Sequence, residues 1–231
     1  SGGKFTGKPF RPTALESLYD VLGLSTEKTQ YLRGVRTLEQ SNGGPFRNRG
    51  DHVLGDIINS TPTYVAEPDR VRYPLVWKDN HLKGDPGNFP ENAGTPYSNP
   101  GSNGFAQQNA NRDPMVYVGA NDGMLHGFDA NTGAERIAYV PGTLLDDVDA
   151  LTEPGYTHRY YVDGSPATGD AFFGGEWHSV LVGGMNNGGN AVYALDITDP
   201  DSFSEANASS TVLWEYTASG ALGQTYGKPS I

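Results

Sequence analysis

The sequence predicts an all-β protein, a partial β-propeller with blades of antiparallel meanders, preceded by a short helical hairpin. Two observations predict this class. The 231 residues include 31 glycines and 16 prolines, a composition typical of many short segments joined by turns. A unit of strands and tight turns also occurs twice, at a spacing typical of propellers. Because a propeller closes with about four to eight blades, we expect the chain to be one part of a larger ring.

The first unit consists of three short strands separated by two tight turns. The strands are rich in β-branched, aromatic and aliphatic residues, and the first turn has an Asn-Asp-Gly sequence that favours a hairpin. Three antiparallel strands in succession form a meander, the core of a propeller blade. In chain order the elements are residues 115–118, Asn121-Asp122-Gly123, 124–128, 129–133 and 136–140.

The second unit repeats this pattern, so we predict that residues 115–140 and 180–216 form equivalent meanders without a helix in either span. We align Val180-Leu-Val-Gly-Gly with Val116-Tyr-Val-Gly-Ala, and Asn186-Asn-Gly-Gly with Asn121-Asp-Gly. Residues 192–196 then correspond to 125–129, and residues 212–216 supply the last strand.

A proline motif precedes each unit and marks where a new blade begins. Pro62, Pro166 and Pro229 follow Ser-Thr, Gly-Ser and Gly-Lys, respectively. Pro62 and Pro166 are 104 residues apart, whereas Pro166 and Pro229 are 63 apart. A Pro- and Asn-rich insert at residues 66–113 accounts for the longer interval. We predict that this insert is a long loop with little regular structure, lying outside the sheets.

The N-terminal part has a different pattern. Residues 1–11 predict a flexible lead-in, and residues 12–48 a helical hairpin and linker before the partial propeller of residues 49–231. Thr13 begins the first predicted helix, and Ser25 or Thr26 caps the second. The second helix is expected to place three residues on one apolar face, namely Tyr31, Leu32 and Val35. We expect the apolar residues at 53, 54, 57 and 58 to lead into a strand at Tyr64 and Val65.

Composition excludes several classes of function. The chain has 27 acidic and 16 basic residues, a formal net charge of −11, which disfavours nucleic acid as a partner. No stretch approaches the 18 apolar residues that a membrane-spanning helix needs. The sequence has no cysteine, so disulfides, thiolate metal sites and cysteine nucleophiles are all excluded.

Few residues qualify as catalytic, cofactor or metal ligands, and we assign none. The acidic turns Asp129–Gly133 and Asp196–Asp201 carry oxygen ligands that calcium could use, but turns in which Asp bonds its own backbone explain them better. Asp163 and Asp170 do not have a diagnostic spacing for paired catalytic carboxylates. The three histidines at 126, 158 and 178 lack metal-ligand spacing, and we expect His126 to be a structural residue within a strand.

One short motif has a mechanism for binding. Arg49-Gly50-Asp51 carries a cation and an anion on either side of glycine, which an integrin-type receptor can recognise when the loop is exposed. We predict receptor binding by Arg49, Gly50 and Asp51, with an exposed loop that binds nothing as the alternative.

Three motifs together resemble one protein family. They are Leu54-Gly-Asp-Ile-Ile-Asn-Ser-Thr-Pro62-Thr-Tyr-Val65, the segment from Val116 to Gly133, and the segment from Val182 to Asp196. In this order they resemble the C-terminal propeller of the PilC/PilY family of type IV pilus-associated adhesins.

The resemblance implies an extracellular, non-enzymatic protein on the cell surface or pilus of a Gram-negative bacterium. Such a protein supports pilus biogenesis against retraction, twitching motility and adhesion to host cells. The implied partners are pilins or minor pilins and a host receptor, for which an integrin-type receptor is the candidate. Family members carry an Asp-rich calcium loop in a later blade. No such loop occurs here, so calcium would belong to the missing part of the propeller.

Two alternatives compete with this interpretation. The Asp-Ala-Asn-Thr-Gly133 turn is also similar to repeats of quinone-dependent dehydrogenases, which bind pyrroloquinoline quinone and calcium at the centre of a closed ring. The vicinal cysteine pair found in many of those enzymes is absent here. A propeller scaffold for outer-membrane assembly would share the blades but lack the three motifs above.

Overall fold

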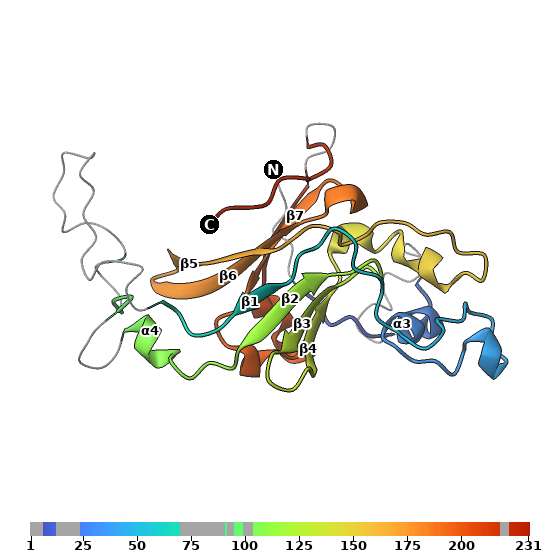
Figure 1. The fold of residues 1–231 in the computed structure, drawn as a ribbon, viewed down its shortest axis with the longest axis horizontal. Coiled ribbons are helices and arrows are strands. Elements are labelled where there is room, and N and C mark those ends of the chain that lie inside the picture. Colours follow the sequence, from blue (N-terminus) through green and yellow to red (C-terminus); the bar gives the residue numbers. More distant parts are fainter. Residues whose placement is uncertain (1–6, 13–23, 70–90, 92–94, 99–103, 218–221) are drawn as a thin grey trace.

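The computed structural model contains two four-stranded antiparallel sheets, each with its strands in chain order (Figure 1). It describes residues 7–12, 24–69, 91, 95–98, 104–217 and 222–231. The first sheet consists of β1 (Thr63–Val65), β2 (Met115–Gly119), β3 (Leu125–Asp129) and β4 (Glu135–Tyr139). The second consists of β5 (Ala167–Phe173), β6 (Glu176–Gly184), β7 (Ala191–Asp196) and β8 (Val212–Thr217). The predicted all-β class and the two meanders are therefore confirmed.

The register of the two sheets corrects our alignment by one residue. Met115 lies opposite Asp129 in the first sheet, and Val180 lies opposite Asp196 in the second. Val180 is therefore the counterpart of Met115, whereas the sequence alignment paired Val180 with Val116. Both alignments match one Val-rich strand with another. A shift of one residue, however, moves every side chain of a strand to the opposite face of the sheet.

A short helix also appears in a span where we expected none. Helix α5 (Ala208–Thr211) lies between β7 and β8. The corresponding connection in the first sheet is the tight turn after Asp129, in which Gly133 donates its backbone N–H to the Asp129 carbonyl. The prediction of helix-free spans was therefore wrong for the second unit. The longer connection after β7 has room for a helical turn, and Thr211 bonds the Asn207 carbonyl there.

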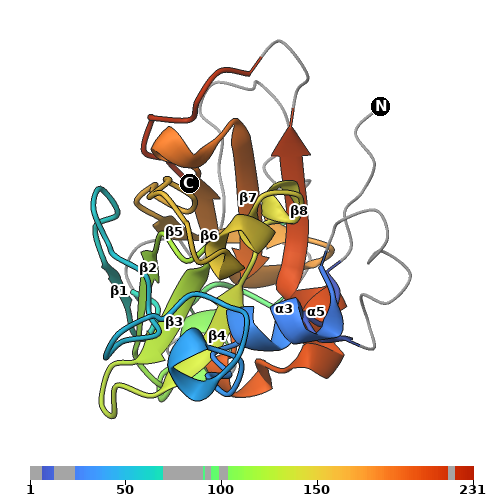
Figure 2. The ribbon, with the colours of Figure 1, turned by 90° about the vertical axis from the view of Figure 1, so that its right-hand side faces the viewer.

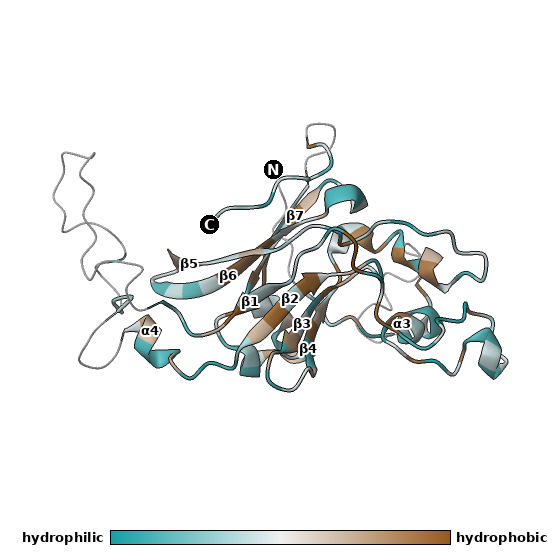
Figure 3. Cartoon of the chain, in the orientation of Figure 1, coloured by the Kyte–Doolittle hydropathy of each residue, from teal (hydrophilic) through white to brown (hydrophobic). Residues whose placement is uncertain are grey.

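The hydrophobic core lies where the two sheets meet. Leu125 of the first sheet and Leu181 and Leu195 of the second are fully buried members of one cluster. Tyr139 and Tyr193 pack ring against ring across the sheets, with 5.2 Å between centroids. Figure 3 shows apolar residues along the central strands of both sheets. Burial of several aromatic side chains between the two sheets strongly stabilises their packing against each other.

The N-terminal segment contributes helix α3 (Thr26–Leu32), the second helix of the predicted hairpin. Ser25 caps it, as its hydroxyl accepts a 3.3 Å hydrogen bond from Lys28 N–H. Tyr31 and Leu32 are buried as expected, but Val35 lies beyond the helix and is exposed. Residues 13–22, the first predicted helix, fall outside the described residues. Arg33, the C-cap residue of α3, forms an ion pair with Glu205 in the segment between β7 and β8, so the N-terminal segment also contacts the second unit. Figure 2 views the chain from the side on which α3 lies.

In the sequence, the insert lies between β1 and β2 of the first sheet. Its described part, however, packs on the second sheet. Tyr97 packs on Trp177 of β6 at 5.0 Å between ring centroids. Its hydroxyl donates a 2.6 Å hydrogen bond to Asp170 of β5. Helix α4 (Phe105–Gln108) belongs to the same small cluster. Most of residues 70–103 lies outside the described residues, so the expected lack of regular structure stays a prediction there.

The apolar run before β1 is not a strand. Residues 53, 54, 57 and 58 have no strand partner, and β1 contains only residues 63–65. Their side chains are more than a third exposed. In the part of the chain that the structure describes, no helix has the length and apolar character needed to span a membrane.

Candidate functional site

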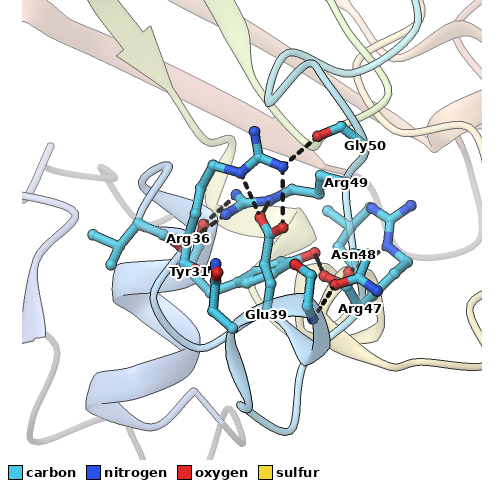
Figure 4. Close-up of polar contacts among 11 residues, drawn as sticks. Tyr31, Arg36, Glu39, Arg47, Asn48, Arg49 and Gly50 are labelled. Carbon is cyan, nitrogen blue, oxygen red and sulfur yellow. Dashed lines mark hydrogen bonds and ion pairs between the residues drawn. The ribbon is translucent and has the colours of Figure 1, made fainter.

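The predicted receptor motif lies in a network of charges around one buried carboxylate. Glu39 has a side chain with 0% exposure, and its Oε1 accepts hydrogen bonds from Arg36 Nε at 3.1 Å and from Arg49 Nε at 2.8 Å. Figure 4 shows the two guanidinium groups converging on this carboxylate. Burial raises the pKa of Glu39, but the bonds from Arg36 and Arg49 outweigh that effect and lower the pKa overall.

The guanidinium of Arg49 is directed into the fold. Its side chain is only 7% exposed. Nη1 donates to the Tyr31 carbonyl at 2.6 Å, and Nη2 donates to the Val35 carbonyl at 2.7 Å. The group also lies over the Tyr31 ring, 3.8 Å from its centroid. Through these hydrogen bonds and the ring contact, Arg49 holds the C-terminal end of α3 against the loop that contains Arg49.

Gly50 and Asp51 are exposed, so the structure places only part of the tripeptide at the surface. Gly50 has φ of +64°, a left-handed conformation that favours glycine, and its carbonyl accepts a hydrogen bond from Arg36. The geometry separates the two charges, because Arg49 points inward while Asp51 faces solvent. Receptor binding by the complete tripeptide stays a prediction, and this arrangement does not present both charges to a partner.

The two acidic turns bond their own backbones, as the turn interpretation requires. Asp129 Oδ1 accepts from the N–H groups of Asn131 and Thr132 at 2.9 and 2.8 Å. Asp196 Oδ1 accepts from Thr198 N–H at 2.9 Å. These bonds satisfy the carboxylates locally. Among the described residues, the structure shows no cluster of three or more His, Asp or Glu side chains arranged to hold a metal ion.

His126 is a buried side chain between two acids. It donates through Nδ1 to Glu135 at 2.6 Å and through Nε2 to Asp122 at 3.1 Å. Burial lowers its pKa, but the bonds to Asp122 and Glu135 outweigh this and raise the pKa to about 9. His158 and His178 pair instead with Asp56 and Asp196, so the three histidines do not converge. Both ring nitrogens of His126 are bonded within the fold, an arrangement that agrees with the expected structural role.

The structure separates Asp163 from Asp170 and gives each a different set of partners. Asp170 accepts from Tyr97 and Ser179 at the outer end of the second sheet. Asp163 is buried and accepts from the backbone N–H and the side-chain amide of Asn59, at 3.1 and 2.8 Å. Asn186 also donates to it, at 3.1 Å. The sequence analysis did not predict the hydrogen bonds between Asn59 and Asp163. The two residues do lie at equivalent positions before Pro62 and Pro166, which are 104 residues apart.

Two meander sheets packed face to face, each with a proline motif before its first strand, define a segment of a β-propeller. Residues 54–231 match the family model described as the PilY1 beta-propeller domain. The chain therefore belongs to the PilY1 β-propeller family.

Relatives with similar sequences support this membership. The chain is 40% identical over 232 aligned residues, 98% of its length, to a "Type IV pilus biogenesis factor PilY1 homolog" of Xylella fastidiosa strain Temecula1. It is 38% identical over 89% of its length to the "Type IV pilus biogenesis factor PilY1" of Pseudomonas aeruginosa strain PAK. It spans 16% of the length of each relative. The crystal structure of the Pseudomonas aeruginosa PilY1 C-terminal domain matches at 42% identity and a TM-score of 0.42, over 55% of this chain and 23% of that one.

Proposed function

We propose that this chain forms part of the propeller of a type IV pilus biogenesis factor and acts by binding rather than by catalysis. The observation that carries the proposal is the 40% identity to a pilus biogenesis factor over nearly the whole chain. The fold agrees with a binding role, because a propeller displays its connecting loops from a rigid framework of sheets. The polar groups described above are engaged in structural hydrogen bonds.

The proposed partners are pilins or minor pilins, and the proposed location is the cell surface or the pilus. Support for pilus assembly against retraction, twitching motility and attachment to host cells follow from the same proposal. A host receptor of integrin type remains a candidate through Arg49, Gly50 and Asp51. The exposure of Asp51 favours that candidate, while the buried position of Arg49 does not.

A binding experiment tests the proposal directly. The purified chain is immobilised and exposed to purified minor pilins and, separately, to the major pilin of the same organism. The proposal predicts saturable binding to at least one of them, and loss of binding when the chain is unfolded by urea. Binding to none of the pilins, with the chain folded by circular dichroism, would contradict a direct contact with these partners.

A further inference from the structure

The outer edge of β4 has no strand partner in the part of the chain that the structure describes. β4 is the last strand of the first sheet, and it pairs with β3 alone (Figure 1). In such an edge strand, every second residue directs its backbone N–H and C=O groups away from the sheet. An open edge of this kind is a template for one more strand.

The charged side chains that could shield this edge are held elsewhere. Charges on an edge strand normally hinder further pairing. The guanidinium of Arg136, however, donates to the carboxylate of Asp201 in the connection between β7 and β8. The carboxylate of Glu135 bonds Nδ1 of His126 at 2.6 Å. Ala138, the exposed residue near the end of the strand, has a side chain too small to cover the backbone.

A cleft of about 1140 Å³ lies along this edge. Every residue from 135 to 140 lines the cleft, so the whole of β4 borders it. Other segments complete the lining, with Leu32 and Arg33 at the end of α3, Phe10 in the N-terminal segment, and Phe203 in the connection between β7 and β8. The edge of β4 therefore faces a space that is bounded by the rest of the fold.

The volume of the cleft fits a single added strand. Strands in a sheet lie about 4.8 Å apart, advance by about 3.4 Å per residue and form layers about 10 Å thick, so five residues of one strand occupy about 800 Å³. The cleft exceeds this volume by less than a factor of two, which leaves room for one strand but not for a four-stranded sheet. An added strand would use the edge of the first sheet and leave its faces to the packing between blades.

The chemistry of the cleft favours an uncharged strand. Arg33 already pairs with Glu205, and Glu215 accepts from the Tyr139 hydroxyl and from Gly142 N–H. A charge brought by a partner would compete with these existing contacts. Four partly buried apolar side chains line the same space, namely Phe10, Ile137, Val140 and Phe203.

We infer that the edge of β4 binds an extended, uncharged segment of a partner protein, which joins the first sheet as a fifth strand. The outward N–H and C=O groups of β4 supply the hydrogen bonds, and the apolar lining of the cleft receives every second side chain of the segment. The inference goes beyond the proposed function, because it concerns how a partner is held and does not depend on which protein supplies the strand.

Binding of a synthetic peptide tests this inference. A fluorescein-labelled Thr-Val-Thr-Val-Thr peptide, whose β-branched residues favour an extended backbone, is kept at trace concentration while the chain is titrated and the fluorescence anisotropy is measured. A second probe has the same side chains but a methyl group on every backbone nitrogen, so it has no N–H to donate. Ala138→Lys places a charge on the edge of β4. Ala134→Lys is the matched control, because Ala134 is also exposed but lies before β4 and outside the cleft.

The wild-type chain and Ala134→Lys should bind the first probe equally, with a dissociation constant below about 1 mM. Ala138→Lys should bind it about tenfold more weakly or worse, and the methylated probe should lose binding to the wild type by a similar factor. The methylated probe tests the edge in the unaltered chain, so the result does not depend on the folding of a variant.

Three results would overturn the inference. One is the absence of saturable binding of the first probe to the folded wild-type chain. Another is equal binding of the two probes, because side chains alone would then hold the peptide. The third is dimerisation of the wild-type chain that Ala138→Lys abolishes, because a second copy would then occupy the edge.

Discussion

The side-chain amide of Asn59 donates a 2.8 Å hydrogen bond to Oδ2 of Asp163, 104 residues further along the chain. The two residues occupy the same position of the repeat, three residues before the proline that precedes each sheet. Adjacent residues continue the pattern, since Ser60 Oγ donates to the Gly164 carbonyl and Thr61 N–H donates to Ser165 Oγ. The segments that begin the two sheets are therefore bonded to each other residue by residue.

Replacement of Asp163 by alanine should weaken the contact between the segments that begin the two sheets. The substitution removes a buried carboxylate that accepts from the backbone N–H and side-chain amide of Asn59 and from the side-chain amide of Asn186. We expect a loss of about 2–4 kcal/mol in the free energy of unfolding, measured by urea denaturation. Asp201→Ala is the matched control, because Asp201 is an exposed partner of Arg136, and it should cost less than about 1 kcal/mol. Equal losses in the two variants would show that Asp163 has no special role.

Replacement of Arg49 by alanine should also destabilise the chain, because the guanidinium of Arg49 neutralises the negative charge of the buried Glu39 carboxylate. We expect a loss of about 3 kcal/mol at neutral pH. Arg33→Ala, which removes an exposed pair with Glu205, should cost less than about 1 kcal/mol. The double variant Arg49→Ala/Glu39→Ala should recover part of the stability. No recovery in the double variant would mean that Arg49 acts through the Tyr31 ring and the carbonyls of Tyr31 and Val35 rather than through Glu39.

The pH dependence of stability tests the same pair. The pKa of Glu39 is lowered in the folded state. Its contribution is therefore present above the unfolded pKa and is lost as the pH falls through the folded value. Glu39→Gln should flatten the decrease in stability of the wild type on acidification. An unchanged acid profile in that variant would argue against an ionised Glu39.

His126 should give the opposite dependence at high pH. Its folded pKa of about 9 lies above the unfolded value, so its contribution is complete below about pH 6.5 and is lost as the pH rises through 9. The wild type should lose roughly 3 kcal/mol more than His126→Gln between about pH 6 and pH 10. Parallel profiles for the two proteins would show that the bonds to Asp122 and Glu135 do not favour the protonated ring.

Receptor binding by the tripeptide can be tested at Asp51. Because Arg49 is held by Glu39 and by two carbonyls, we expect wild type and Asp51→Glu to bind immobilised integrin equally. Asp69→Glu is the control from the start of the long insert. Loss of binding in Asp51→Glu but not in Asp69→Glu would show that a receptor recognises Asp51 even though Arg49 points inward.

The repeat could be predicted from the sequence because turn chemistry is local. Asn121-Asp122-Gly123 and the proline motifs predict both sheets from the sequence alone. The register could not be predicted to the residue, because Met115 and Val116 fit an apolar run equally well. The backbone pairing of Met115 with Asp129 decides between them.

Long-range contacts explain what the sequence did not predict. Exposure of the complete tripeptide was expected from its polar surroundings, but the buried Glu39 draws Arg49 inward. Likewise, nothing local to Tyr97 indicates that it bonds Asp170 in the second sheet. Such pairs depend on how separate segments pack, which a single sequence does not display.

The central claim is that this chain serves type IV pilus biogenesis, and complementation in cells tests it most directly. A strain lacking the full-length gene receives either the wild-type gene or one without the codons for residues 1–231, and pilin sheared from the cell surface is quantified together with protein level. The account predicts that the wild-type gene restores surface pili and that the deleted gene, expressed to the same level, does not. Normal surface pili from the deleted gene would contradict it.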